Sequence, residues 1–245
     1  MLLTALAFLG MLGTFLVGSS RATMRSSVGG PLSRGTMPSR QLRQTHPHAR
    51  LFKNDLLERL THTRLTITIG FWFPVSCGEI ALGLSQAQLT SASTIGALAA
   101  GLAAWVPVEY LLHRFVFHLD RWIPAAARFC FVMHGCHHAD PSDASRDMMP
   151  LVGSTPIMCV VLACSILSFG PALGFVFVGA FGLAYLAYDV MHHGCHQWSL
   201  PGRIGTYLQR HHLLHHFRDD ARHFGVTSPL CDWLFGTLRM GRPDE

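Results

Sequence analysis

Five apolar stretches restrict this chain to folds that a membrane accommodates. They cover approximately residues 1–17, 65–84, 95–112, 151–169 and 172–190. A membrane-spanning helix needs about 20 apolar residues, so several stretches are short, and Pro74, Pro107 and Pro156 favour kinks within them. With 13% charged residues and a mean hydropathy of +0.30, the chain is too apolar for an ordinary soluble domain of its length. The sequence therefore predicts an all-α integral membrane protein.

Basic residues orient the predicted spans. The stretch before residue 65 contains nine of them: Arg21, Arg25, Arg34, Arg40, Arg43, Arg50, Lys53, Arg59 and Arg64. Membrane proteins keep such residues on the cytoplasmic side. If residues 65–112 and 151–190 each form a helical hairpin that crosses and returns, the segments between and after them lie on that side too. The sequence thus predicts two transmembrane helical hairpins under a cytosolic, histidine-rich helical cap.

The first 50 residues differ in composition from the rest. Residues 1–20 form a hydrophobic segment that is predicted to be a membrane anchor, and hence an extra helix, or a signal sequence. Residues 21–50, rich in Ser, Gly, Pro and Arg, predict a flexible basic linker. The alternative is an over-extended start, with Met24 or Met37 as initiator. Residues 51–245 are predicted to be the membrane-embedded functional domain.

Histidines are the most informative residues of that domain. Ten of them form four clusters: His113 with His118, His134-x-x-His137-His138, His192-x-x-x-His196, and His212-x-x-His215-His216. Residues three and four apart share a helix face, so each triplet is predicted to point its rings the same way. His113 and His118, five apart, diverge around a straight helix and are expected near a helix end or on separate metals. Because imidazole is the commonest metal ligand, the clusters predict a two-metal site.

Four carboxylates are expected to support the histidine ligands. Glu109 and Asp189, and more weakly Asp140 and Asp143, are candidates to accept ring N–H bonds from the ligands, although each could instead cap a helix or pair with arginine. The remaining histidines lack the ligand spacing, and a surface or neighbouring position is predicted for them: His46, His48, His62, His193, His211 and His223. The seven cysteines form no Cys-x-x-Cys pair, which predicts free thiols.

Several classes of function fit the sequence poorly. Nucleic-acid binding is not expected, since the basic residues are juxtamembrane and no recognition motif accompanies the net charge of +5. A metal transporter would place its polar ligands near the bilayer midplane, whereas these histidines lie beyond the apolar stretches. A zinc hydrolase is disfavoured because no His-Glu-x-x-His motif is present.

The histidine motifs resemble those of the fatty acid 2-hydroxylases, within the wider fatty acid hydroxylase and sterol desaturase superfamily. The matching segments are Glu109-Tyr-Leu-Leu-His-Arg-Phe-Val-Phe-His118, His134-Gly-Cys-His-His-Ala-Asp-Pro-Ser-Asp143, Tyr188-Asp-Val-Met-His192, His212-Leu-Leu-His-His-Phe217 and Phe224-Gly-Val-Thr-Ser-Pro229. Similarity extends from about residue 51 to 237. The resemblance implies oxygen-dependent hydroxylation of an acyl chain at the carbon beside its carbonyl, with all ten clustered histidines as ligands of a dinuclear centre. A sterol or carotenoid oxygenase or a desaturase is the alternative within the superfamily.

Cofactors and partners follow from that resemblance. Oxygen insertion needs a redox-active metal, so two iron ions are expected, with zinc a substitute in purified protein. No haem segment is present, so a separate electron donor is expected: a cytochrome b5-like protein, a ferredoxin or a reductase. Membrane lipids and an acyl-lipid substrate, a free fatty acid or a ceramide, complete the partners. The expected location is the endoplasmic reticulum in a eukaryote or the inner membrane in a bacterium.

The sequence departs from the family pattern at three positions. At Asp147 and Leu151 the family pattern leads us to expect an apolar residue and a proline, and at His211 a tyrosine.

Overall fold

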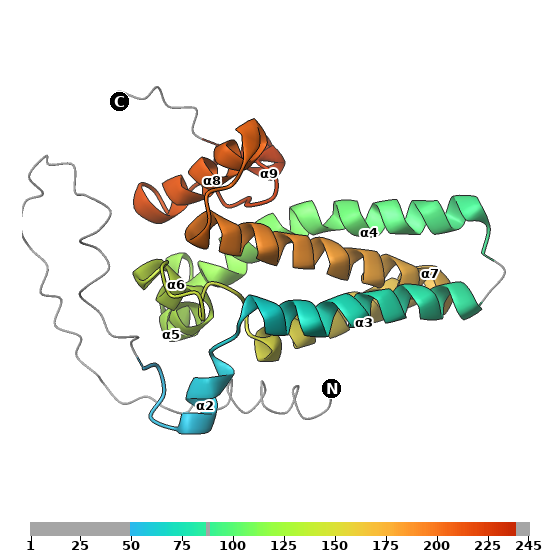
Figure 1. Ribbon diagram of the computed structural model, residues 1–245, viewed down its shortest axis with the longest axis horizontal. Helices are drawn as coiled ribbons and strands as arrows, with labels where there is room; N and C mark the ends of the chain where they lie inside the picture. The colour runs from blue at the N-terminus through green and yellow to red at the C-terminus, as the bar shows by residue number, and fades with distance from the viewer. Residues whose placement is uncertain (1–49, 87–88, 239–245) are drawn as a thin grey trace, which may run out of the picture.

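The computed structural model describes residues 50–86 and 89–238. The predicted N-terminal segment 1–20 and nearly all of the linker 21–50 therefore lie outside the described residues. Within the described ranges every regular element is a helix or helical turn. Figure 1 shows long helices lying side by side in an elongated bundle, with short helices gathered at one end. We call that end, which contains α2, α5, α6, α8 and α9, the cap.

The first hairpin consists of α3 (Leu65–Gln86) and α4 (Ser91–Leu111), close to the apolar stretches that predicted it. Thr90 begins α4 by accepting the Ser93 backbone N–H on its hydroxyl at 3.1 Å. Pro74 and Pro107 both lie inside helices. At about 1.5 Å of rise per residue, helices of 22 and 21 residues cross the roughly 30 Å apolar core of a bilayer.

The second hairpin is contained in α7 (Leu151–Gln197), whose 47 residues form two arms. The arms meet at Gly170, where φ is 76° and ψ is 167°, a conformation that glycine adopts without steric cost. A Cβ placed on Gly174 would lie 2.8 Å from the Ile166 nitrogen, so the chain folds back on itself here. With α3 and with α4 extended to Phe117, α7 is long and apolar enough to cross a membrane. The predicted all-α fold with two hairpins is confirmed.

Aromatic side chains join the hairpins. The Trp105 ring of α4 lies 5.3 Å from Phe181, 5.3 Å from Tyr185 and 5.2 Å from Tyr188, all on the second arm of α7. Trp72 of α3 contacts Tyr185 at 5.9 Å between ring centroids. Such pairs contribute roughly 0.5–1.5 kcal/mol each beyond the area they bury. The second arm is thereby held between α3 and α4, and its last turns enter the cap in a defined orientation.

Replacing Gly101 with leucine is expected to lower the midpoint of thermal unfolding in detergent. A Cβ at this position would lie 2.3 Å from the Phe177 carbonyl oxygen and 2.9 Å from the Ala180 Cβ. Overpacking of a close helix contact costs roughly 1–3 kcal/mol or more. Gly96 is the matched control on α4, because nothing lies within 4 Å of a Cβ there. Equal losses in the two variants would contradict close packing of α4 on α7 at Gly101.

Short elements form the cap and carry most of the histidines. After α4 the chain forms a π-helical turn, two 3-10 turns and a second π-helical turn among the short helices. Their bounds are α2 (Asp55–Leu60), the π-helical turn Leu112–Phe117, the 3-10 turns Leu119–Arg121 and Pro124–Ala126, α5 (Ala127–Cys130), the π-helical turn Phe131–Gly135, α6 (Cys136–Ala139), α8 (Gly202–Phe217) and α9 (Leu230–Leu234). These elements surround the cap ends of α4 and α7.

Candidate metal centre

The ten clustered histidines meet in the cap in two groups of five. The first group is His113, His118, His134, His138 and His215, and the second is His137, His192, His196, His212 and His216. Within each group one ring nitrogen per residue lies within 4.8 Å of all the others. The groups adjoin, since the His138 ring stacks on His216 with 4.1 Å between centroids.

The Nε2 atoms of the first group form a continuous series of contacts. The successive distances are 3.0 Å for His113 to His134, 3.0 Å for His134 to His138, 3.1 Å for His138 to His215 and 3.2 Å for His215 to His118. Five converging nitrogens cannot all be paired by protons on one another, because every inward lone pair needs its own donor. A shared cation satisfies all of them, and imidazole suits iron as well as zinc.

The second group has the same character. His137 and His216 approach at 3.1 Å between Nε2 atoms, and His196 and His212 at 2.8 Å. The His192 ring lies 4.6 Å from that of His212, and its two buried nitrogens have no hydrogen-bond partner within the described residues. Buried polar atoms without partners are rare unless an ion or water satisfies them. The residues of both groups therefore fit a metal ion.

The two triplets divide their rings between the groups in a reciprocal way. His134 and His138, four residues apart, belong to the first group, while His137 between them belongs to the second. His212 and His216 belong to the second group, and His215 to the first. The rings of each triplet thus converge on one centre, as predicted, but they serve both halves of it.

A π-helical turn explains the place of His113 and His118. In the turn Leu112–Phe117 hydrogen bonds join residues five apart, so residues at that spacing share a face. Both rings belong to the first group, with 5.3 Å between their centroids. The expectation of a helix end is confirmed, and the place of both rings in one group favours a shared metal over the alternative of separate metals. Turns of this kind recur at functional sites.

Burial keeps the rings neutral, the form that binds metal. Desolvation lowers the pKa of His138 to about 4. It also lowers the pKa of His118 to about 2, with a further contribution from the neighbouring rings. For the same reasons the pKa values of four further histidines lie well below the usual value: His134, His137, His212 and His215.

Backbone carbonyls orient two of the rings. His113 donates its Nδ1–H to the Phe224 oxygen at 2.6 Å, and His215 donates to the Arg222 oxygen at 2.7 Å. With the proton on Nδ1, the Nε2 lone pair of each ring points into the first group. The loop after α8 therefore sets the tautomer of two rings.

Glu109 has a different task from the one predicted. Its carboxylate accepts the backbone N–H of Val226 and of Thr227, the latter at 3.0 Å, and the Thr227 hydroxyl. It does not accept the His113 ring N–H, because the Phe224 carbonyl already occupies Nδ1. Glu109 instead holds the loop that orients His113.

The predictions for Asp140 and Asp143 are also corrected. Each carboxylate accepts the backbone N–H and hydroxyl of the serine two residues later, Ser142 and Ser145, in turns typical of aspartate. Asp143 additionally lies 3.8 Å from Arg146, the arginine pairing that was the alternative. Asp189 is fully buried one turn before His192, and no hydrogen bond joins the two side chains within the described residues.

Two buried carboxylates, Asp232 and Asp147, bind histidines outside the two groups, and the sequence did not predict these contacts. His211 lies outside both groups and donates Nε2–H to Asp232 at 3.2 Å, while its Nδ1 lies 3.0 Å from that of His223. His193 also lies outside them and donates Nδ1–H to Asp147 at 2.8 Å. The partners are 21 and 46 residues apart, so no local spacing indicated either pair. The one available signal was the departure from the family pattern at Asp147 and His211.

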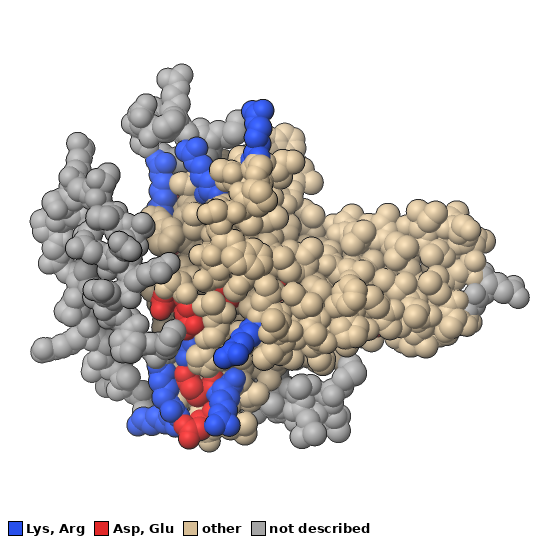
Figure 2. All heavy atoms as spheres, in the orientation of Figure 1, with Lys and Arg blue, Asp and Glu red and all other residues tan. Residues whose placement is uncertain are grey.

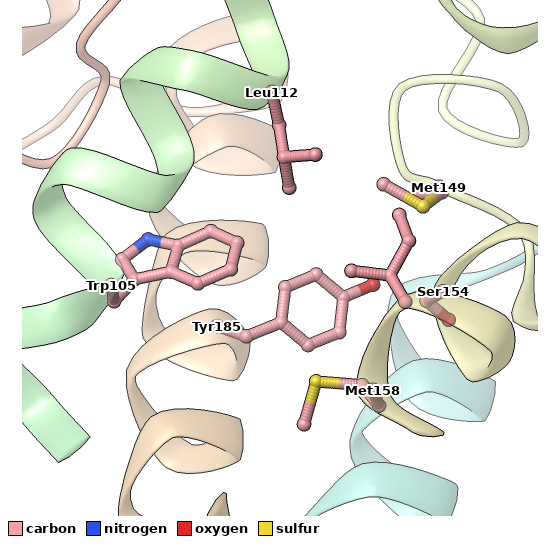
Figure 3. A pocket seen from close by; sticks show the side chains of 7 residues that line it. Trp105, Leu112, Met149, Ser154, Met158 and Tyr185 are labelled. Carbon is pink, nitrogen blue, oxygen red and sulfur yellow. The ribbon is translucent and has the colours of Figure 1, made fainter. Parts of the chain in front are cut away.

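An apolar pocket lies between the cap end of α4 and the two arms of α7 (Figure 3). It has an empty volume of about 210 Å³ and is lined by Trp105, Leu112, Met149, Ser154, Ile157, Met158 and Tyr185. Leu112 immediately precedes His113. Trp105 contacts Tyr188, whose ring in turn stacks on His192 at 5.6 Å. The pocket lining is therefore linked to the first group along the chain, through Leu112, and to the second through the contacts of Trp105 and Tyr188.

Comparison with known proteins identifies the family. The family model described as fatty acid hydroxylase matches residues 98–237, which include all ten clustered histidines. The chain belongs to the fatty acid hydroxylase family. It is therefore an oxidoreductase, and the resemblance seen in its motifs is confirmed.

Relatives within this family have defined activities. Dihydroceramide fatty acyl 2-hydroxylase FAH2 of Arabidopsis thaliana is 32% identical over 190 residues, covering 77% of this chain and 79% of the relative. Ceramide very long chain fatty acid hydroxylase SCS7 of Saccharomyces cerevisiae is 36% identical, covering 77% of this chain and 49% of that protein. Human fatty acid 2-hydroxylase is 32% identical, with 79% and 58% covered. The chain thus spans about half the length of the latter two relatives.

A solved structure supports the fold. Full-length scs7p, in which only the hydroxylase domain is visible, superimposes with a TM-score of 0.72 at 30% identity. The superposition covers 79% of this chain and 72% of that one. The helical bundle and its cap are therefore those of a fatty acid hydroxylase domain.

Proposed function

We propose that this hydroxylase introduces a hydroxyl group at carbon 2 of a fatty acyl chain, in a free fatty acid or in an acyl lipid such as ceramide. The proposal rests on one observation: two adjoining groups of five histidines lie at the cap end of the bundle, and an apolar pocket lies among residues that lead to them, Leu112 along the chain to His113 and Trp105 through Tyr188 to His192. The names of the relatives support an acyl substrate carried by a sphingoid base.

The ten histidines are proposed to hold two iron ions. When bound, iron supplies the redox chemistry that inserts oxygen from dioxygen into an unactivated C–H bond, for which zinc lacks a second oxidation state. Neutral rings contribute no negative charge to offset the cations. Asp189, buried one turn before His192, is the carboxylate that we propose for this purpose.

The protein would exclude water and position the acyl chain. Trp105, Leu112 and Met158 offer the apolar walls along which methylene groups pack. Tyr185 and Ser154 also belong to the lining. A chain placed in the pocket would present the carbon beside its carbonyl to the rings, while the polar head stays at the interface. This placement explains why the centre lies at the end of the bundle.

The cap is proposed to face the cytosol. Figure 2 shows Lys and Arg on the cap. On the same face, the part of the bundle away from the cap displays neither basic nor acidic side chains. Basic residues flank the cytoplasmic ends of spans. In that orientation a separate soluble or membrane-bound donor, such as a cytochrome b5-like protein, a ferredoxin or a reductase, reaches the cap. The membrane would be the endoplasmic reticulum in a eukaryote or the inner membrane in a bacterium.

Lipid mass spectrometry tests the proposal. The chain is expressed in a host that lacks 2-hydroxyacyl lipids, under aerobic and iron-replete conditions, beside a strain with an empty vector. New lipids are expected to gain the mass of one oxygen atom, derived from isotopically labelled dioxygen and assigned by fragmentation to the carbon beside the carbonyl. Identical lipids in the two strains, or oxygen placed on a sterol or carotenoid instead, would contradict it.

A further inference from the structure

The segment from Asp143 to Pro150 is the second part of the connection from α6 to α7, and polar contacts hold its outer side. Arg146 donates to the Glu58 carboxylate of α2 and contacts His62 Nε2 at 2.9 Å. The Ser145 hydroxyl lies 2.8 Å from His62 Nδ1, and the Ser145 carbonyl accepts the Thr63 N–H at 2.9 Å. His62, for which a plain surface position was predicted, is half-buried in this network.

The inner side of the same segment is held by one hydrogen-bonded pair. Asp147 accepts the Nδ1–H of His193 at 2.8 Å and a hydrogen bond from Gln197 at 3.4 Å. The Asp147 side chain is 0% exposed and that of His193 12%. Removal of one member of such a pair leaves a buried polar group without its hydrogen-bond partner, which is costly. Asp147 and His193 therefore act as a unit.

The chain neighbours of this pair belong to the pocket and to the second group. Two residues after Asp147, Met149 lines the pocket on the side opposite Trp105 (Figure 3). Met149 also packs on the start of α7, since its sulfur lies 3.3 Å from where a Cβ on Gly153 would be. On the other side, His193 directly follows His192 of the second group. The pair thus joins the segment that carries Met149 to the helix that carries His192.

We propose that Asp147 and His193 are positioning residues that fix Met149 as a wall of the acyl pocket and so determine which acyl chains fit. The inference rests on the proposed function for its substrate but on the hydrogen-bonded pair for its mechanism. It concerns a feature of this chain, because the family pattern leads us to expect an apolar residue at 147.

Two measurements on purified full-length protein test the role. Hydrogen–deuterium exchange of the peptide covering residues 143–150 measures how often the backbone of this segment opens, and it requires no enzymatic turnover. Steady-state kinetics with palmitoyl and lignoceroyl dihydroceramide in detergent micelles report selectivity. Asp147→Leu and His193→Phe each remove one partner, Asp147→Asn keeps the hydrogen bond, and Asp220→Leu removes the exposed partner of Arg121 as a matched control.

Asp147→Leu and His193→Phe are each expected to speed exchange in the 143–150 peptide. They should also change the KM ratio of the two substrates by about tenfold, the lower end of what reshaping an apolar pocket produces, with kcat and metal content unchanged. Asp147→Asn, which can still accept the His193 N–H, and Asp220→Leu should resemble the wild type. The double variant, which leaves neither polar group without its partner, should exchange more slowly than either single variant.

Other outcomes overturn the proposal in distinguishable ways. If exchange is unchanged in Asp147→Leu, the Asp147–His193 pair does not hold the pocket wall in place. The same conclusion follows if the effects of the two substitutions on exchange simply add in the double variant. Faster exchange with an unchanged KM ratio would refute its role in selectivity. If the wild type hydroxylates neither substrate, the proposed function fails, and the exchange data still decide whether the pair holds the wall. Should Asp147→Leu not fold, His193→Phe and Asp147→Asn provide the comparison.

Discussion

His134→Ala and His137→Ala are each expected to lower the metal content from about two ions to about one per chain. The two residues are neighbours in one triplet but belong to different groups of five rings, so each variant should deplete a different half of the centre. Hydroxylation should fall more than about a hundredfold in both, beyond the roughly 10–100-fold that loss of a residue supporting a ligand costs. Elemental analysis of iron-reconstituted protein and lipid mass spectrometry provide the measurements.

A histidine outside the groups is the control for that experiment. His62 contacts Ser145 and Arg146 rather than the ring clusters, so His62→Ala should retain the wild-type metal content. The double variant of His134 and His137 should lose both ions. If either single variant keeps two ions, or if His62→Ala loses one, the division into two groups is wrong.

Asp232→Ala is expected to destabilise the cap by about 3–5 kcal/mol, the usual cost of removing one member of a buried charged network. The Asp232 carboxylate is fully buried and accepts the N–H groups of Phe224 at 2.9 Å and Gly225 at 2.8 Å, the His211 ring N–H and the Thr237 hydroxyl. Alanine would leave these buried donors without an acceptor. Because Phe224 also orients His113, metal content should fall together with the thermal midpoint.

The contribution of Asp232 to stability is expected to depend on pH, which provides a second test of the same network. Burial alone raises the pKa of this carboxyl, but the hydrogen bonds from His211, Thr237 and the two backbone N–H groups bring it below the usual value. Its stabilisation is therefore present above the unfolded-state pKa of about 3.9 and is lost as acid protonates the folded carboxyl. The wild type minus Asp232→Asn difference in thermal midpoint should shrink below that pH.

An exposed aspartate is the control for Asp232. Asp220 pairs with Arg121 at 2.7 Å but has a 61% exposed side chain, and exposed pairs contribute about 0–1 kcal/mol. Asp220→Ala should leave the midpoint nearly unchanged. A loss as large as that of Asp232→Ala would mean that the cap responds to charge in general, not to the buried acceptor.

The membrane fold followed from local composition. Residues 65–84, 95–112, 151–169 and 172–190 each become a helix or an arm because an apolar segment in a bilayer must satisfy its backbone internally. Even the turn of the second hairpin corresponds to the gap between two stretches, at Gly170. Which ten histidines come together was likewise predictable from the sequence, since helical spacing depends only on neighbours along the chain.

The amino-acid sequence by itself determined that this protein is a helical membrane hydroxylase and which ten imidazoles are proposed as its metal ligands, because apolar length, helical spacing and family motifs are local properties. Only the tertiary structure decided how the rings divide between two groups, that a π-helical turn brings His113 and His118 together, and that Glu109 holds a loop. It also decided the partners of Asp232 and Asp147. These features depend on which segments distant in sequence meet in the cap, and no spacing along the chain encodes that meeting.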